Sequence, residues 1–99
     1  MLNINKETDG NNLTIALSGR LDTTTAPDLE SKLKESLDGV IALSIDCKEL
    51  EYISSAGLRV LLFAHKVMNK QGGMVIRNIS KDIKEIFDIT GFSDILTIE

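Results

Sequence analysis

Two adjacent serines, Ser54 and Ser55, stand directly before a segment whose apolar spacing predicts a helix. The first turn of a helix presents backbone N–H groups without partners and the positive end of the helix dipole. A phosphate esterified to Ser55 would gain from those donors, and Arg59, one turn further along, could assist. A simpler interpretation is that one serine caps the helix and that Gly57 permits close packing against a sheet. The residues alone leave both interpretations open.

Catalytic chemistry at these serines finds no support elsewhere in the sequence. The single histidine, His65, follows Ser55 on the same predicted helix at about 15 Å, given a rise of 1.5 Å per residue, too far to act as its base. The turn does not match the Gly-x-Ser-x-Gly elbow of hydrolases, and Gly72-Gly73 lacks the spacing and the lysine of a phosphate-binding loop. No Cys/His cluster has metal-ligand spacing. We therefore expect no catalytic residue, no metal and no cofactor.

Composition restricts the class of protein and the kind of partner. The 99 residues, 42% hydrophobic and 26% charged, suit one domain spanning residues 1–99. A net charge of −4 would repel nucleic acid and anionic membrane surfaces. The single cysteine, Cys47, lies in an apolar run and is expected to be a buried structural thiol. Without a secretory signal or a membrane-length apolar run, the chain is expected to be soluble and cytoplasmic.

The hydrophobic pattern changes period several times along the chain, which predicts alternating strands and helices. A hairpin-like start is expected, with turn chemistry at Asp9–Asn12, and Thr24 or Thr25 is expected to cap the first helix. The predicted strands lie near residues 2–5, 13–17, 40–45, 74–76 and 95–98, and the predicted helices near 24–37, 55–71 and 80–91. The continuous apolar character of residues 40–45 favours a central strand covered on both faces. The order ββαβαβαβ favours an α/β sheet with right-handed crossovers.

The predicted helix at 55–71 places the two serines differently. At 100° per residue, one face carries Leu58, Leu61, Ala64 and Met68, and the opposite face carries Arg59, Lys66 and Lys70. Ser55 projects toward the solvent side near Arg59, whereas Ser54 projects toward the apolar face. Ser55 is therefore ranked above Ser54 as a modification site.

The segment Ile53–Leu58 resembles the signature of STAS domains, specifically the small stand-alone anti-sigma-factor antagonists. Gly19–Ala26 resembles that family's second conserved stretch, and the length and element order also agree, so that the resemblance covers nearly the whole chain. It implies the STAS fold: a single α/β domain with a mixed sheet and helices packed mainly on one face.

The resemblance also implies roles for individual residues. In that family the serine two places before the glycine is phosphorylated by a cognate anti-sigma factor that is also a kinase, and this position is Ser55. The family's acidic residue after the second strand falls on Asp22. Many members have aspartate where this chain has Ser54, and Ala56 replaces a common serine or threonine. The implied partner-binding set is Asp22, Thr23, Ser54, Ser55, Ala56, Gly57 and Arg59.

The function implied is a non-catalytic partner switch. The unphosphorylated protein, a monomer when free, would bind the anti-sigma factor kinase and so release a sigma factor. Phosphorylation of Ser55 would break the complex, and a phosphatase would reset it. Two alternatives are an unphosphorylated adaptor subunit of another assembly, such as a lipid-transport ATPase complex, and a nucleotide-sensing module.

Overall fold

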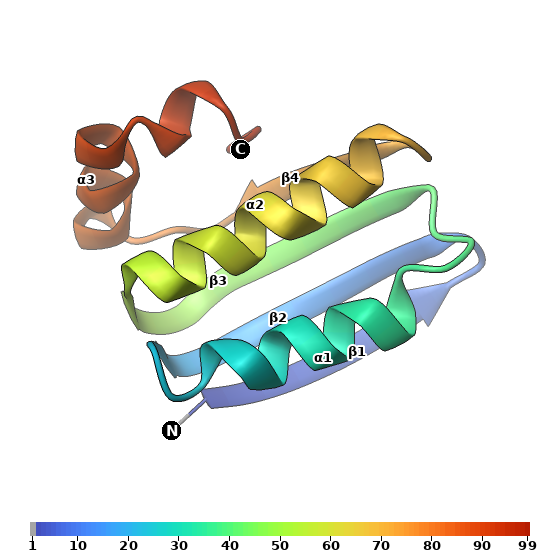
Figure 1. Ribbon diagram of the computed structural model, residues 1–99, viewed down its shortest axis with the longest axis horizontal. Coiled ribbons are helices and arrows are strands. Elements are labelled where there is room, and N and C mark those ends of the chain that lie inside the picture. The colour runs from blue at the N-terminus through green and yellow to red at the C-terminus, as the bar shows by residue number, and fades with distance from the viewer. Residues whose placement is uncertain (1) are drawn as a thin grey trace.

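A computed structural model describes residues 2–99 and places four strands in one mixed sheet (Figure 1). The strands β1 (Leu2–Asp9), β2 (Asn12–Leu21), β3 (Ala42–Ile53) and β4 (Gly73–Arg77) stand side by side in chain order. β1 is antiparallel to β2, as the predicted hairpin requires, while β2, β3 and β4 run parallel to one another. The predicted mixed sheet is therefore confirmed.

Three helices connect or follow the parallel strands. α1 (Ala26–Ser36) and α2 (Ser55–Asn69) lie next to each other over one face of the sheet, and both begin at the same end of it (Figure 1). α3 (Lys81–Thr90) lies near that end and is followed by a short 3₁₀ helix, Phe92–Asp94. This shared end is dictated by topology, because each helix follows the carboxyl end of a parallel strand.

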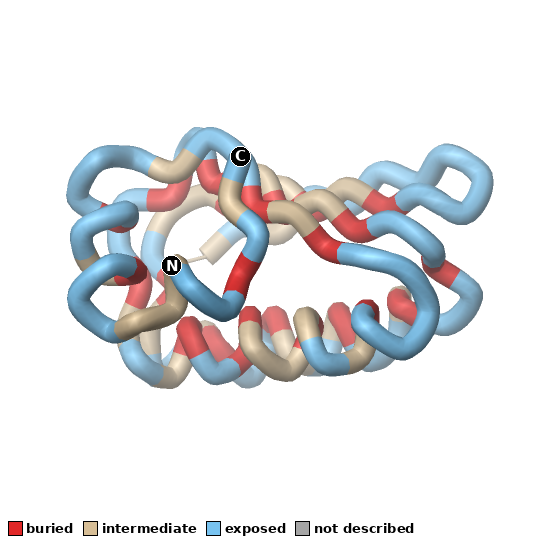
Figure 2. The backbone as a smooth tube through the Cα atoms, turned by 90° about the horizontal axis from the view of Figure 1, so that it is seen from above, coloured by how far each residue is buried: buried red, intermediate tan, exposed pale blue. Residues whose placement is uncertain are grey.

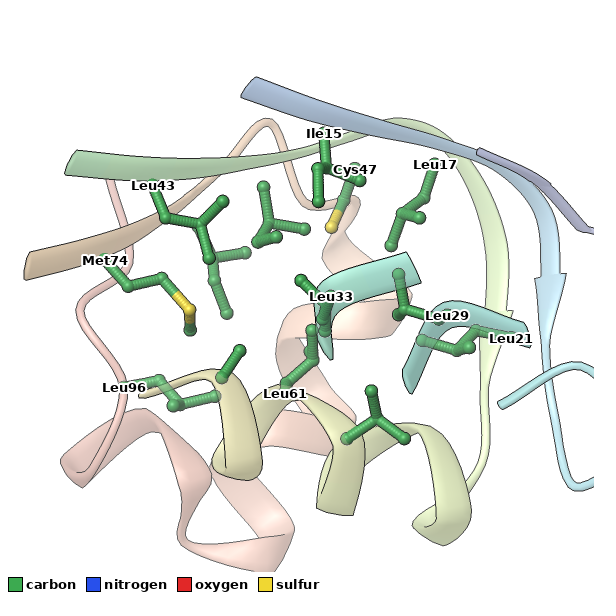
Figure 3. Packing of buried hydrophobic residues seen from close by; sticks show 14 of the residues in the cluster. Ile15, Leu17, Leu21, Leu29, Leu33, Leu43, Cys47, Leu61, Met74 and Leu96 are labelled. Carbon is green, nitrogen blue, oxygen red and sulfur yellow. The ribbon is translucent and has the colours of Figure 1, made fainter. Parts of the chain in front are cut away.

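The core lies between the sheet and this layer of helices, where the buried positions are concentrated (Figure 2). Along β2, Leu13, Ile15 and Leu17 are buried while the intervening side chains are only partly covered, which is the period-2 alternation of a strand with one covered face. Figure 3 shows the side chains of the sheet and helices interdigitating. The helices contribute Leu29, Leu33, Leu61, Met68 and Phe87 to this core.

The central strand β3 differs from its prediction in position and in cover. It begins at Ala42 and continues to Ile53, so that Asp46 lies inside the strand and not at its end. Leu43 and Ile45 are buried, but Ser44 and Asp46 between them are only half-buried, so the expectation of cover on both faces was wrong. The polar residues of the second half occupy the uncovered positions, and irregularities in the register with β2 shift the alternation.

The predicted last strand is reduced to one bridge. Residues 92–94 form the 3₁₀ helix, and only Ile98 pairs with the sheet, in a parallel bridge to Ile76 of β4. The Leu96 N–H donates to the Phe92 carbonyl oxygen at 2.9 Å, so this N–H forms a hydrogen bond within the turn and not with a neighbouring strand. Leu96 is buried and Ile98 packs against the core, which explains why their pattern resembled a strand.

The predicted start and end of the third helix are confirmed. The Ser80 hydroxyl accepts a hydrogen bond from the Ile83 N–H at 3.2 Å, as an N-cap should. Gly91 ends α3 with a φ of 83°, in the left-handed region that favours glycine. No helix among residues 2–99 is long and apolar enough to cross a membrane.

Cys47 is buried in β3, as predicted for a structural thiol. Removal from water, together with the negative charge of neighbouring Asp46, raises the pKa of the thiol to about 12. At neutral pH the sulfur is therefore protonated, which makes it a poor nucleophile.

Candidate functional site

Two segments meet where β2 and β3 end. Leu21 pairs with Ile53 in the parallel ladder, and the N–H of Ser54 donates a 2.8 Å hydrogen bond to the carbonyl oxygen of Leu21. Asp22 follows directly on one side of this bond and Ser55 on the other. The structure therefore brings together the two segments that the sequence marked, at the sheet edge where ligand sites of α/β folds gather.

Asp22 is held by the turn that follows it. One carboxylate oxygen, Oδ1, accepts hydrogen bonds from the Thr24 hydroxyl at 2.8 Å, the Thr24 N–H at 3.0 Å and the Thr25 N–H at 3.1 Å. The Thr24 hydroxyl contributes most, and with the bonds from Thr25 it lowers the pKa of Asp22 below the usual 3.8, despite partial desolvation. The second oxygen, Oδ2, lies 3.9 Å from the Nε of Arg20. Asp22 therefore carries a fixed negative charge in a fixed orientation.

The prediction that a threonine caps α1 is corrected in detail. Thr25 occupies the N-cap position, but its side chain makes no capping bond to the helix. Its hydroxyl instead donates to the Arg20 carbonyl oxygen at 2.8 Å and accepts from the Asp22 N–H at 2.9 Å. The Thr25 hydroxyl is thus engaged with the strand-end backbone, while the Asp22 carboxylate accepts from the N–H groups of Thr24 and Thr25 just before the helix.

The two serines have different environments. Ser54 is the N-cap of α2, in extended backbone, and its Oγ accepts a hydrogen bond from the Gly57 N–H at 3.3 Å. Ser54 is half-buried, whereas Ser55 is exposed at the first position of α2. No hydrogen bond of the Ser55 hydroxyl occurs within residues 2–99. Of the two, Ser55 has the hydroxyl that a large partner can reach.

Gly57 sits where α2 packs tightly against the ends of β2 and β3. A Cβ atom at this position would lie 2.7 Å from Leu21 Cγ and 2.9 Å from Ile53 Cγ1, which is closer than packed carbon atoms approach. Gly57 is thus a packing requirement, as the simpler interpretation held. By allowing this approach it also fixes the height of Ser55 above the ends of β2 and β3.

A groove runs between the first halves of α1 and α2. It has a volume of about 320 Å³ and is lined by Thr23, Ala26, Pro27, Glu30, Ala56, Arg59, Val60 and Phe63. Sequence reasoning had selected Thr23, Ala56 and Arg59 but missed the others. A signal was present: Val60 and Phe63 lie outside the predicted core face and form a second apolar stripe three residues apart, which is the stripe that faces α1.

A cation–π pair also escaped the sequence analysis. Arg20 and Tyr52 pair across the β2–β3 ladder, and the Arg20 guanidinium carbon lies 4.3 Å from the centroid of the Tyr52 ring. Because Arg20 also approaches Asp22, this pair supports the Asp22 segment from the strand side. The pair could be predicted only from the register between β2 and β3, which a single sequence does not reveal.

The remaining chemistry of the described residues is limited. His65 lies further along α2, and its Nε2 is 3.2 Å from the Asn69 side-chain nitrogen. Within residues 2–99, no three His, Cys, Asp or Glu side chains are grouped so as to hold a metal ion. The arrangement thus places the held carboxylate of Asp22 and the exposed hydroxyl of Ser55 on one surface at the ends of β2 and β3.

Comparison with known proteins extends this picture. A family model described as "STAS domain" matches residues 3–99. The "Anti-sigma-B factor antagonist" of Bacillus subtilis (strain 168) is 33% identical over 98 residues, which cover 98% of this chain and 90% of that protein. An anti-sigma factor antagonist from Mycobacterium paratuberculosis has a similar structure, with a TM-score of 0.89 and 23% identity, over 99% of this chain and 85% of that one.

The same fold occurs in SpoIIAA, an anti-sigma factor antagonist solved in two forms. Its unphosphorylated form has a TM-score of 0.77 at 17% identity and covers 98% of this chain and 87% of its own. The phosphorylated form from Bacillus has a TM-score of 0.76 at 17% identity, over 98% and 91% of the two chains. At this identity the likeness concerns the fold, which is the one that the sequence predicted.

Proposed function

Because this chain belongs to the STAS domain family, we propose that it is an anti-sigma-factor antagonist, which binds a cognate anti-sigma factor and so releases a sigma factor. The observation that carries the proposal is the 2.8 Å bond between Ser54 and Leu21, which joins the Asp22 segment to the start of α2 as one surface. The name of the Bacillus subtilis relative supports the same role.

The proposed surface has a fixed shape before any partner arrives. Asp22 is held by its neighbouring threonines, and α2 is held against the sheet through Gly57. A preformed surface loses little conformational entropy when a partner docks. The partner-binding residues are proposed to be Asp22, Thr23, Ser54, Ser55, Ala56, Gly57 and Arg59.

The proposed off-switch is phosphorylation of Ser55 by the same partner. The γ-phosphoryl group of ATP, held in the partner's own site, transfers to Ser55 Oγ, whose proton is lost, and ADP is released. The added charge of roughly −1.5 to −2 units weakens binding of the partner to this surface, and the protein does not need to refold. A separate phosphatase hydrolyses the ester and restores binding. Ser55 is exposed, whereas the Ser54 hydroxyl is engaged in capping α2, and this difference supports Ser55 as the phosphorylated residue.

Ser54 in place of the aspartate of many family members is compatible with this mechanism. Serine and aspartate are both strong N-cap residues, because each places a side-chain oxygen within reach of the N–H groups of the first turn. Ser54 makes that bond to Gly57 in the structure. The substitution removes one negative charge beside Ser55 and keeps the start of the helix. The proposed role places the protein in the cytoplasm, free as a monomer, where sigma factors act.

A two-step experiment tests the switch. The tagged wild-type protein is purified from its native cells with its partners, and mass spectrometry identifies those partners and the phosphorylated serine. Binding of the recovered anti-sigma factor is then measured by calorimetry for Ser55→Ala and Ser55→Asp. Ser55→Ala should bind whether or not ATP is present, and Ser55→Asp should lose binding by tenfold or more, on the order of 1.4 kcal/mol.

Thr8→Asp provides the matched control, because it adds the same charge to exposed β1 at the far end of the molecule. It should bind as the wild type does. Tight binding by Ser55→Asp, or phosphate on Ser54 alone, would contradict the proposed switch.

A further inference from the structure

The α2 side of the groove between α1 and α2 has a charge of opposite sign to that of the whole chain. The net charge of the protein is −4, yet α2 carries Arg59 and Lys66 and no carboxylate. Both side chains are exposed. Arg59 lines the groove, and Lys66 lies about two turns further along α2, so this side of the groove carries positive charge on an acidic protein and attracts carboxylates.

The charges across the groove do not cancel this rim. Glu30 of α1 is already paired, because its carboxylate lies 3.1 Å from the Nζ of Lys34. Lys34 in turn lies 5.8 Å from the centroid of the Phe63 ring. Arg59 takes part in no ion pair or side-chain hydrogen bond within residues 2–99. Its guanidinium is thus available to a carboxylate from outside.

Five of the eight residues that line the groove are apolar, and the other three are Thr23, Glu30 and Arg59. Ala26 and Val60 are buried, and Pro27, Ala56 and Phe63 complete its walls. The groove, with a volume of about 320 Å³, has room for an aliphatic side chain, whose burial is favourable by about 25 cal/mol per Å² of apolar surface.

We propose that this groove binds an apolar side chain of the partner, flanked in the partner's sequence by carboxylates that pair with Arg59. The inference rests on the proposed function, because it names the chemistry by which the anti-sigma factor is recognised. It also connects recognition to the switch. Ser55 directly precedes Ala56 of the groove and lies one helical turn from Arg59, so a phosphate on Ser55 competes for the guanidinium that the partner's carboxylate requires.

Synthetic peptides test the groove without any natural partner. The probe is an acetylated, amidated nonapeptide, Gly-Ser-Gly-Glu-Leu-Glu-Gly-Ser-Gly, added to ¹⁵N-labelled full-length protein and followed by chemical-shift mapping. Two matched peptides replace the leucine by serine or both glutamates by lysines. The Glu-Leu-Glu peptide should shift the amides of Ala26, Ala56, Arg59 and Phe63 with a Kd on the order of 1 mM, and the matched peptides should bind at least about threefold more weakly.

Protein variants complete the test. Arg59→Glu should weaken binding of the Glu-Leu-Glu peptide about threefold to fivefold, as expected for an exposed ion pair. Lys81→Glu makes the same change of charge at the start of α3 and should leave binding unchanged. Ala56→Leu fills the groove and should abolish the shifts; if it does not fold, Arg59→Glu still decides.

Shifts confined to other surfaces, no response up to millimolar peptide, or an equal response to the lysine peptide would overturn the groove proposal. These results do not test phosphorylation of Ser55, because the peptide experiment includes no kinase. Conversely, tight binding of the anti-sigma factor by Ser55→Asp would refute the switch and leave the peptide results intact.

Discussion

The backbone N–H of Ser54 and the carbonyl oxygen of Leu21 form a 2.8 Å hydrogen bond just beyond the ends of two parallel strands. This bond extends the ladder by one step into the site. It makes the residue after β2 and the first residue of α2 neighbours in space, although more than thirty residues separate them in sequence. The site is thus an extension of the sheet, and its geometry depends on the packing of the sheet.

The two serines should separate stability from switching. Ser54→Ala removes the oxygen that caps α2 and should lower the free energy of unfolding by about 1 kcal/mol. Ser55→Ala removes an exposed hydroxyl and should change stability by less than about 0.5 kcal/mol. Urea denaturation of both variants checks this difference. Equal losses would mean that the cap has been assigned to the wrong residue.

Gly57→Ala should be destabilising, because its Cβ would overlap Leu21 and Ile53. Overpacking of this kind costs about 1–3 kcal/mol. Gly73→Ala is the matched control, since a Cβ there meets no atom within 4 Å. Thermal and urea unfolding of the two variants provide the measurement. A neutral Gly57→Ala would show that α2 can move away from the strand ends at little cost.

Gln71 should stabilise the fold from the far end of α2. Its side-chain Nε2 donates to the carbonyl oxygens of Leu37 and Val40, at 2.6 and 2.7 Å, and so joins the end of α2 to the segment after α1. Gln71→Ala should lower the free energy of unfolding by about 1–2 kcal/mol. Asn69→Ala, which loses only a surface contact to His65, should stay within about 0.5 kcal/mol of the wild type. Similar losses for both variants would contradict this.

Asp22 should contribute to stability in a pH-dependent way. Its folded pKa lies below 3.8, so the ionised form favours the folded state above that pH, and the contribution is lost as the pH falls through the folded pKa. The stability difference between wild type and Asp22→Asn should therefore be largest above about pH 5 and shrink toward acid. Urea denaturation between neutral and acid pH measures it. A difference independent of pH would show that the carboxylate charge plays no part.

Much of the fold was predictable, because local signals and packing agree. The apolar face of α2 and the bounds of α3 near residues 80 and 91 each follow from residue type and spacing, and the structure places them as predicted. The second half of β3 was missed because Lys48, Glu49 and Glu51 look like a loop when read without the sheet. Irregularities in the pairing of β3 with β2 place these polar residues at exposed positions. That pairing depends on the tertiary structure and not on the local sequence.

The site was predictable in its members more than in its contacts. The positions of Ser55 and Asp22 followed from motif resemblance, and their proximity follows from parallel pairing of β2 and β3. The bonds of the Thr25 hydroxyl to the backbone of Arg20 and Asp22 were not predictable, because a threonine near a helix start can bond to several backbone groups. The spacing of Val60 and Phe63 indicates that a second face of α2 is covered, but the groove depends on how α1 and α2 pack together, which that local pattern does not specify.

The burial of Cys47 makes this protein a convenient object for single-site labelling. Its one native thiol is buried in the core and has a pKa of about 12, so thiol reagents at neutral pH should not react with it. A cysteine introduced at exposed Asn11, in the hairpin turn, would then be the only reactive one. That turn lies at the opposite end of β2 from Leu21, about 30 Å away at the rise of a strand. A fluorophore or surface tether attached there would leave the end of the molecule with Asp22 and Ser55 free. Binding and release of the partner could then be followed in real time without changing either residue.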